Sequence, residues 1–206
     1  LEKIFDIPSD LFNTLASFEN SIARQGNYLF TGSALDFKML KAYLFDKMGH
    51  GHKIENLGYQ IGFQFFLWNN KVNLLNGQSL MIDENGIFTH NNKSFYVPSA
   101  NKIYLNNMSA YLSQKKMIAI ESDVSMDKYF QMMMEVHKDY AISAILFTIS
   151  SLFQDIIVNE IGNFPILFLY GPGSSGKDQL AECCQSFFGI PQSAINLEGG
   201  ASTLKG

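Results

Sequence analysis

The order of elements in the C-terminal half is decided by one stretch, FPILFLYGPGSSGKD, which occupies residues 164–178. It opens with an uninterrupted apolar run, which suits a buried central strand. Gly171, Gly173 and Gly176 then precede Lys177. Glycines let the backbone wrap a phosphate closely, the following helix adds the partial positive charge of its N-terminus, and the lysine reaches the outer phosphates. The stretch therefore predicts a strand at 165–170, a phosphate-binding P-loop at 171–178 and a helix at 178–188.

The setting of this motif makes it more specific than its spacing alone. A bare Gly-x-x-x-x-Gly-Lys pattern arises by chance in roughly 5% of chains of this length. An apolar strand before it and a helix after it lower that frequency, so a glycine-rich turn without a ligand is the weaker interpretation. ATP and Mg²⁺ are the predicted cofactors, and Lys177 is the residue expected to act in catalysis. The predicted nucleotide-binding residues are Gly171, Pro172, Gly173, Ser174, Ser175, Gly176, Lys177, Asp178 and Gln179.

Asp178 departs from the usual pattern, in which a Ser or Thr hydroxyl follows the lysine and coordinates Mg²⁺. A carboxylate is also an oxygen ligand for Mg²⁺, and an acidic residue in the first turn suits the helix dipole. It nevertheless places a full negative charge beside the phosphates. Asp178 is therefore the predicted metal ligand, and weakened or altered handling of Mg·ATP is the expected consequence.

The rest of a P-loop NTPase site is missing from the sequence. Such an enzyme needs a second strand that ends in acidic residues, which hold Mg²⁺ and orient water. Only 29 residues follow Lys177, and none of them forms an apolar strand ending in Asp-Glu. The chain is therefore expected to be a piece of a longer ATPase, able to hold phosphate but inactive alone.

The composition indicates a folded protein without an obvious footprint for nucleic acid. Hydrophobic residues make up 47% of the 206 residues, enough for one sizeable core or two small ones. The net charge is -4, and no run of Lys or Arg occurs. Cys183 and Cys184 are adjacent and are interpreted as buried thiols in a reducing cytoplasm. Polar residues interrupt the apolar stretch 141–158, which favours a core helix over a membrane span.

Periodicity predicts an α+β fold with two domains, 1–105 and 106–206. The first domain opens with two helices, which begin near Pro8 and at a Ser33 cap. A small antiparallel sheet follows, in which residues 59–67 alternate as a strand. Its predicted turns are Trp68–Lys71, Asp83–Gly86 and Asn91-Asn92.

The second domain is predicted to be helical up to the P-loop. A helix from Met126 to about His137 is capped by Asp123 or Ser125, and a long apolar helix covers 140–158. The imidazole of His137 is interpreted as structural, because a charged ring at a helix end satisfies the dipole. The truncated start of the NTPase domain completes this part.

Four aromatic residues of the sheet allow a second interpretation. Phe63, Phe65, Phe66 and Trp68 have the chemistry that stacks single-stranded bases. Successive side chains of a strand point to opposite faces, so Phe63 and Phe65 share one face and Phe66 and Trp68 the other. At least one of the two pairs is therefore expected to lie in the core.

Segments on both sides of the P-loop carry a further pattern. They are Leu57–Gln60, Phe65–Asn70, Leu152–Ile157, Phe164–Leu167, Phe187–Gly189, Asn196-Leu197 and Gly199–Thr203. Together with the P-loop, they resemble the ATPase module of phage, plasmid and integrative-element helicase and primase-helicase proteins, with the aromatic β-rich domain that precedes it. The likeness covers most of the chain from about Gly58 onward.

The resemblance implies a superfamily-3 or AAA-like ATPase that works as a homo-oligomeric ring with ATP bound between subunits. It assigns the phosphate-holding role to Gly171, Gly173 and residues 174–177, while Asp178 departs from the family's pattern. Single-stranded or forked DNA is the implied partner of the full-length protein.

Two other functions stay open. A P-loop kinase for a small molecule is weakened by the large β-rich region before the loop and by the lack of a basic, lid-like segment. A non-hydrolysing assembly or DNA-docking module with a degenerate P-loop is favoured modestly by Asp178 and by the acidic balance.

Overall fold

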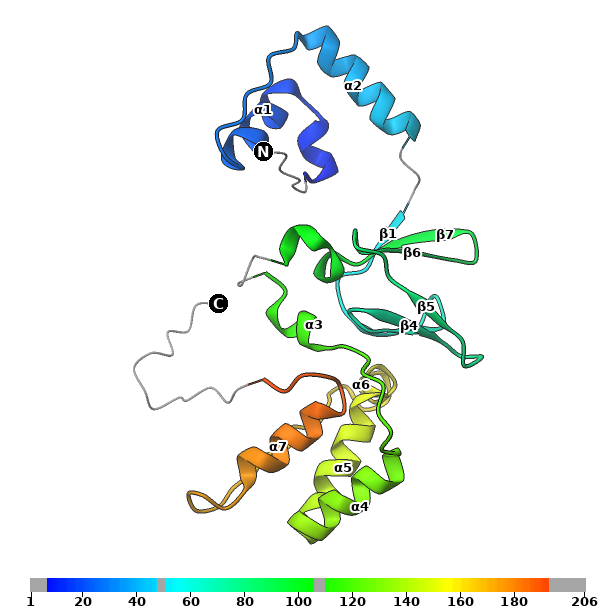
Figure 1. Cartoon of the computed structure of the whole chain (residues 1–206), viewed down its shortest axis with the longest axis vertical. Helices are drawn as coiled ribbons and strands as arrows, with labels where there is room; N and C mark the ends of the chain where they lie inside the picture. Colours follow the sequence, from blue (N-terminus) through cyan, green and yellow to red (C-terminus); the bar gives the residue numbers. More distant parts are fainter. Residues whose placement is uncertain (1–6, 48–50, 106–109, 193–206) are drawn as a thin grey trace. The chain divides into compact units, whose positions relative to one another are not determined.

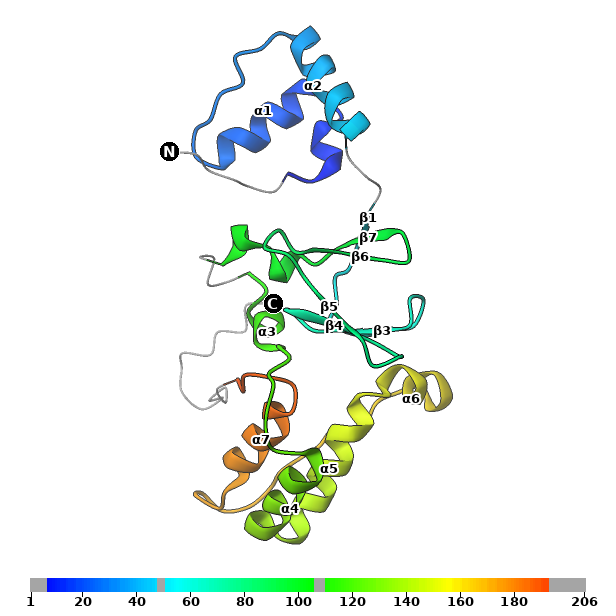
Figure 2. The same ribbon diagram turned by 45° about the vertical axis from the view of Figure 1, so that its right-hand side comes forward.

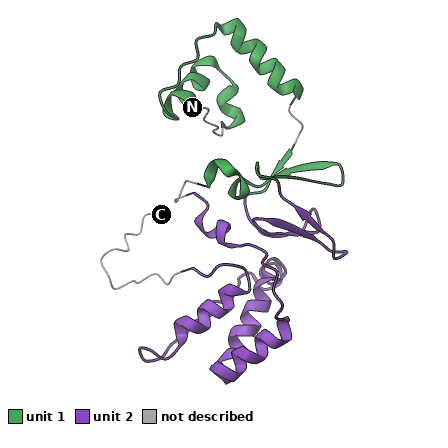
Figure 3. Ribbon diagram, in the orientation of Figure 1, with its two compact units in different colours: residues 1–54, 83–108 green, residues 55–82, 109–206 purple. Residues whose placement is uncertain are grey.

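The structure, a computed structural model, describes residues 7–47, 51–105 and 110–192. Helices and two small sheets make up a mixed α+β fold, as the periodicity predicts. The chain divides into two units (Figure 3), residues 1–54 with 83–108 and residues 55–82 with 109–206. The segments Asn196-Leu197 and Gly199–Thr203 of the family resemblance lie outside the described residues.

The division into units differs from the predicted boundary at residue 105. The expected single sheet is two sheets, one in each unit, and the β-rich region is shared between them. In the first unit, β1 (Gly51–Lys53) pairs in parallel with β7 (Lys93–Tyr96), and β7 pairs antiparallel with β6 (Ile87–His90). The β1–β7 register joins Gly51 to Ser94, a long-range pairing that local alternation does not reveal.

The helices of the first unit start at side-chain caps. The predicted helix from Pro8 is split into a 3₁₀ turn (Ser9–Phe12) and α1 (Leu15–Arg24), because the Thr14 hydroxyl accepts the Ser17 N–H at 3.1 Å. The Ser33 cap is confirmed for α2 (Ala34–Lys47). Its hydroxyl accepts the Asp36 N–H at 3.3 Å, while the Asp36 carboxylate accepts the Ser33 N–H at 2.7 Å.

Two predicted turns of the first unit are confirmed. Asn91 and Asn92 join β6 to β7 with φ of +50° and +59°, values that asparagine tolerates better than most residues. Gly86 has φ of +76°, and its N–H donates to the Asp83 carbonyl at 2.9 Å. A Cβ at Gly86 would collide with the Val97 carbonyl oxygen, so this turn requires glycine.

The sheet of the second unit has the order β2 (Gly58–Gln60), β3 (Phe65–Leu67), β4 (Lys71–Leu74) and β5 (Ser79–Met81), all antiparallel. The strand predicted over 59–67 is wrong, because the chain reverses between β2 and β3 through Gln64, whose φ is +58°. The Trp68–Lys71 turn is confirmed by a 2.8 Å bond from the Trp68 N–H to the Lys71 carbonyl.

Hydrogen bonds tie this sheet to the segment that leads into the helices. The Asn70 amide donates to the Ala119 carbonyl at 3.0 Å and accepts the Ala119 N–H at 2.9 Å. The Ile190 N–H in turn donates to the carbonyl of Lys116, the last residue of α3 (Leu112–Lys116), at 2.8 Å. The chain beyond the P-loop helix is thereby held by the same segment as the sheet.

Helices α4 (Met126–His137), α5 (Asp139–Ser151), α6 (Gln154–Ile161) and α7 (Lys177–Ser186) form the rest of the second unit. The predicted Ser125 cap is confirmed by its 3.3 Å bond from the Lys128 N–H. The predicted long helix over 140–158 is wrong, because α5 and α6 meet at 88°. The chain tightens there, and the Leu152 and Phe153 N–H groups donate to carbonyls three residues earlier.

Among the described residues, no single helix is long and apolar enough to cross a membrane. Helices α5 and α6 reach that length and composition only as a pair with the sharp bend between them.

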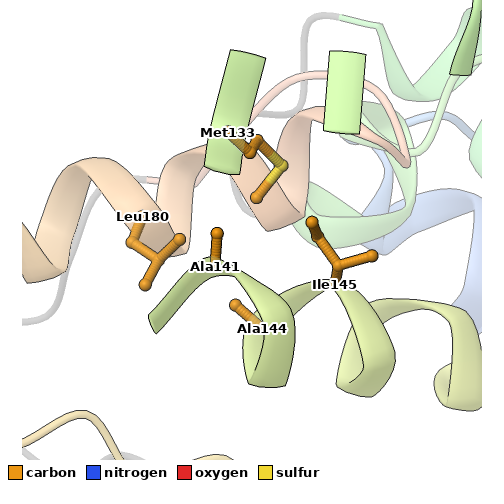
Figure 4. Close-up of a cluster of buried hydrophobic side chains, with 5 residues drawn as sticks. All are labelled: Met133, Ala141, Ala144, Ile145 and Leu180. Carbon is orange, nitrogen blue, oxygen red and sulfur yellow. The ribbon is translucent and has the colours of Figure 1, made fainter. Parts of the chain in front are cut away.

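The core of this helical part lies where α4, α5 and α7 run side by side (Figures 1 and 2). Its buried residues, drawn in Figure 4, are Met133, Ala141, Ala144, Ile145 and Leu180. The two alanines have no exposed surface, and their short side chains let α7 approach α5 closely enough to cover Leu180. Burial of Leu180 therefore sets the position of α7, and with it the residues that precede that helix.

Leu180→Ala is expected to lower the free energy of unfolding of this unit by about 2–5 kcal/mol, because it removes buried methyl groups and leaves a cavity. Urea unfolding followed by the fluorescence of Trp68, the single tryptophan, measures this change. Leu75→Ala is the matched control in the same unit, since Leu75 is 69% exposed and its truncation should cost no more than about 0.5 kcal/mol. Equal effects of the two substitutions would contradict the assignment of Leu180 to the core.

Candidate functional site

The P-loop turns through the left-handed region immediately before α7. Ser174 has φ of +58°, and Gly176, the residue that caps the helix, has φ of +82°. Glycine enters this region freely, whereas serine adopts it rarely. Turns of this kind present successive backbone N–H groups to a common acceptor, and they make concave sites for anions.

The backbone N–H groups of residues 174–179, in the loop and the first helical turn, point to no acceptor in the described part of the chain. The first helical bond is donated by the Leu180 N–H, to the Gly176 carbonyl at 3.0 Å. A run of unused N–H groups at the positive end of a helix dipole favours binding of a phosphate group.

The Lys177 ammonium is folded back onto this loop. It donates to the carbonyl oxygens of Gly171 at 2.9 Å and Pro172 at 2.6 Å, and to the Ser175 hydroxyl at 3.0 Å. These three acceptors are neutral. A phosphate oxygen carries negative charge and forms a stronger bond with an ammonium group, so the lysine has better partners available in a phosphate complex.

The segment before the loop is extended, but it is not a β-strand, and the predicted strand at 165–170 is wrong. Leu167 and Leu169 pack against the α4–α5–α7 core. Ile166, Phe168 and Tyr170 alternate with them and are 80–90% exposed. The alternation is that of a strand with one covered face, but none of the described residues pairs with its backbone, and pairing is what defines a strand.

The predicted residues Gly171 and Gly173 differ in how much space the loop leaves for a side chain. A Cβ at Gly171 would lie 3.3 Å from the Ser175 hydroxyl oxygen, a tight contact, whereas one at Gly173 would meet nothing within 4 Å. The chain itself therefore does not require glycine at 173, and a bound phosphate is a reason for its small size. Gln179 lies exposed in the first turn of α7.

Asp178 is exposed in the first turn of α7. The described part of the chain holds no group of three or more His, Cys, Asp or Glu residues able to bind a metal ion. Mg²⁺ usually keeps several waters and is bound by one or two carboxylates together with substrate phosphates. A single carboxylate next to a phosphate loop has two opposed effects, because it can bind Mg²⁺ that arrives with the nucleotide but repels the phosphates themselves. On balance we expect the repulsion to dominate at Asp178.

Helix α4 contributes residues to the site that sequence reasoning missed. A cavity of about 610 Å³ lies between α4 and the start of α7, and the loop residues 174–176 form one part of its wall. The imidazole of His137 lies 3.9 Å from where a Cβ on Gly176 would be, so this ring is next to the loop. The sequence predicted the helix and placed His137 at its end, but no local pattern indicates which element α4 packs against.

Tyr129 joins α4 to α7 at the other end of this cavity. Its hydroxyl donates to the Cys183 carbonyl at 2.7 Å. Burial raises the pKa of Tyr129 to about 12, and the neighbouring Cys183 adds to the shift. Cys183 and Cys184, predicted to be buried thiols, are half-buried, and burial also raises the pKa of Cys184.

The aromatic set of the sheet is divided between core and surface. Phe65 has no exposed surface, and its ring lies 6.0 Å from that of Phe63. Phe66 and Trp68 are half-buried, with ring centroids 4.9 Å apart. Phe65 is therefore a core residue, but Phe63 is only half-buried, so neither pair lies in the core as a whole. A role in base stacking stays a prediction for Phe66 and Trp68.

Comparison with known proteins gives no further identification, because no family model, no curated protein and no solved structure matches this chain.

Asp178→Ser is expected to tighten binding of Mg·ATP by about fivefold, because it removes about 1 kcal/mol of repulsion between the carboxylate and the phosphates. Isothermal titration calorimetry with wild type and variant measures the change. Asp127→Ser is the control, since Asp127 is also an exposed acidic residue in the first turn of a helix, α4. Weaker binding by Asp178→Ser would instead identify Asp178 as a metal ligand that the nucleotide complex needs.

Tyr129→Phe is expected to remove part of the alkaline dependence of stability. The folded-state pKa lies above the ordinary value of 10, so the unfolded chain loses the phenol proton first and stability falls as pH rises from 10 to about 12. Urea unfolding at several pH values should show a shallower decline for Tyr129→Phe than for wild type. The exposed Tyr140 provides the control, and Tyr140→Phe should leave the decline unchanged.

Proposed function

We propose that this chain binds the phosphates of a nucleoside triphosphate, and that it does so as part of an ATP-dependent DNA helicase or primase-helicase. The observation that carries the first part is the loop 171–177. Its lysine ammonium lies on the loop oxygens, and the N–H groups of residues 174–179 have no acceptor among the described residues.

Phosphate binding in this proposal exchanges weak neutral contacts for charged ones. The amides of the loop donate to phosphate oxygens, and the N-terminus of α7 adds its partial positive charge. Lys177 leaves the Gly171 and Pro172 carbonyls and pairs with the outer phosphates. Mg²⁺ carried in with the nucleotide would neutralise part of the phosphate charge. The Asp178 carboxylate, in the first turn of α7, would attract this ion but repel the phosphates.

The helicase assignment rests on the family resemblance of the segments around the loop. The proposed partners are ATP and single-stranded or forked DNA, the proposed assembly is a homo-oligomeric ring, and hydrolysis is assigned to the full-length protein. The kinase alternative needs a second substrate site beside the loop, and the docking alternative needs no phosphate binding at all. The two experiments below separate these possibilities.

Lys177→Met is expected to weaken binding of Mg·ATP by at least about tenfold, since a hydrogen bond to a charged group contributes about 1.5–3 kcal/mol. Binding of ATP to the chain is measured by calorimetry. Lys47→Met removes the same charge from an exposed lysine in the other unit and should not change the affinity. Binding that survives Lys177→Met undiminished would rule out the loop as the phosphate site and favour the docking module.

Single-stranded DNA is expected to stimulate ATP hydrolysis by the full-length protein severalfold. The measurement is the steady-state rate of phosphate release with and without an unstructured oligonucleotide, and Lys177→Met is the negative control. Indifference to DNA together with stimulation by a small hydroxylated metabolite would contradict the helicase and identify a kinase.

A further inference from the structure

The cavity beside the P-loop runs along the seam between α4 and α7. Two contacts fix its course. At one end the His137 imidazole lies beside Gly176, and at the other the Tyr129 hydroxyl donates to the Cys183 carbonyl. Helix α4 therefore runs antiparallel to the first part of α7. The seam begins at the loop and continues for more than one turn along α7.

The two ends of this cavity differ in chemistry. The loop end is polar and is formed by Ser174, Ser175, Gln179 and His137. Met132, Val136 and Cys183 add apolar or sulfur-containing side chains to the wall of the cavity, with Met132 one helical turn farther from the loop than Val136. Tyr129 also lies there, but its hydroxyl is already bonded to Cys183.

We infer that this cavity receives the nucleoside of the nucleotide whose phosphates the loop holds, with the base against Met132 and Val136 of α4. The inference rests on the proposed function. The cavity shares loop residues 174–176 with the phosphate site, so a ligand bound at the loop continues directly into it. Its volume of about 610 Å³ lies within the range of about 300–1,000 Å³ that is usual for small-molecule sites. An apolar wall with a polar end matches a flat aromatic base joined to a phosphate chain.

The wall chemistry also determines the selectivity of this site. Discrimination between adenine and guanine requires donors and acceptors that match one base and leave the other unpaired. The base end offers thioether, aliphatic and thiol groups, and the Tyr129 hydroxyl, whose proton is donated to the Cys183 carbonyl, can only accept. Methionine surfaces adapt to different partners. The site therefore recognises the presence of a purine base more strongly than its identity.

The test compares ATP, GTP and inorganic tripolyphosphate, each with Mg²⁺, by calorimetry on the whole chain. Tripolyphosphate carries the phosphates without a base. Wild type is expected to bind ATP at least about tenfold more tightly than tripolyphosphate, and GTP within about tenfold of ATP. The double variant Met132→Ala/Val136→Ala should reduce the advantage of ATP about fivefold or more and leave the tripolyphosphate affinity unchanged.

Met134→Ala is the matched control on the same helix. Met134 is 40% exposed and Met132 is 47% exposed, but Met134 does not line the cavity, so its truncation should leave all three affinities unchanged. Alanine keeps helix propensity high, and Met132 and Val136 are not core residues, so the variants should stay folded.

Each failure has a separate signature. The inference of a base site would be overturned if wild type bound ATP and tripolyphosphate with equal affinity. It would also be overturned if the double variant lost affinity for both ligands by the same factor. Phosphate binding at the loop would stand in either case. A preference of more than a hundredfold between ATP and GTP would overturn the predicted low selectivity. If neither ATP nor tripolyphosphate binds, the proposed function itself fails.

Discussion

The close approach of α5 to α7 is the constraint on which the candidate site depends. Ala141 and Ala144 are fully buried, and their small side chains leave the space that Leu180 fills. Leu180 comes three residues after Lys177, and Cys183 and Cys184 follow on the same face of α7. Fixing this face against the core fixes the rotation of the helix. Asp178 and Gln179 of the first turn are therefore left exposed, and the N-terminal end of the helix is held in place before any ligand is bound.

Helix α4 restrains the position of α7 a second time, through a hydrogen bond near its N-terminal end and an apolar contact near its middle. The Tyr129–Cys183 bond and the contact of Met133 with the core hold α4 against α7. His137 consequently lies beside Gly176. One packing arrangement thus serves two purposes, because the helix that stabilises α7 also forms the wall of the cavity beside the loop. His137, which the sequence predicts to be a structural residue at a helix end, is thereby part of the surroundings of the loop.

Local chemistry was predictable from the sequence, whereas pairing and packing were not. Ser33 and Ser125 cap helices as expected, Asn91-Asn92 forms its turn, and α7 begins at Lys177, because each depends on neighbours within a few residues. Three other features could not be read from neighbouring residues. They are the β1–β7 pairing, the reversal at Gln64 and the bend between α5 and α6, and each depends on how distant parts of the chain pack. For the same reason the sequence gives the lysine and glycines of the site but not the contribution of α4.

Residues 164–170, which precede the loop, pair with no strand in the described part of the chain, and this bears differently on phosphate binding and on hydrolysis. All the groups proposed to bind phosphate belong to residues 171–179. Their orientation follows from the packing of α7 against the core and not from a sheet. Hydrolysis has a different requirement, because water must be oriented by an acidic residue on a second strand. In the described part of the chain no strand pairs with residues 164–170, and no acidic cluster of the metal-binding kind is present. The proposed phosphate contacts therefore depend on the packing of α7, whereas hydrolysis would depend on a second strand.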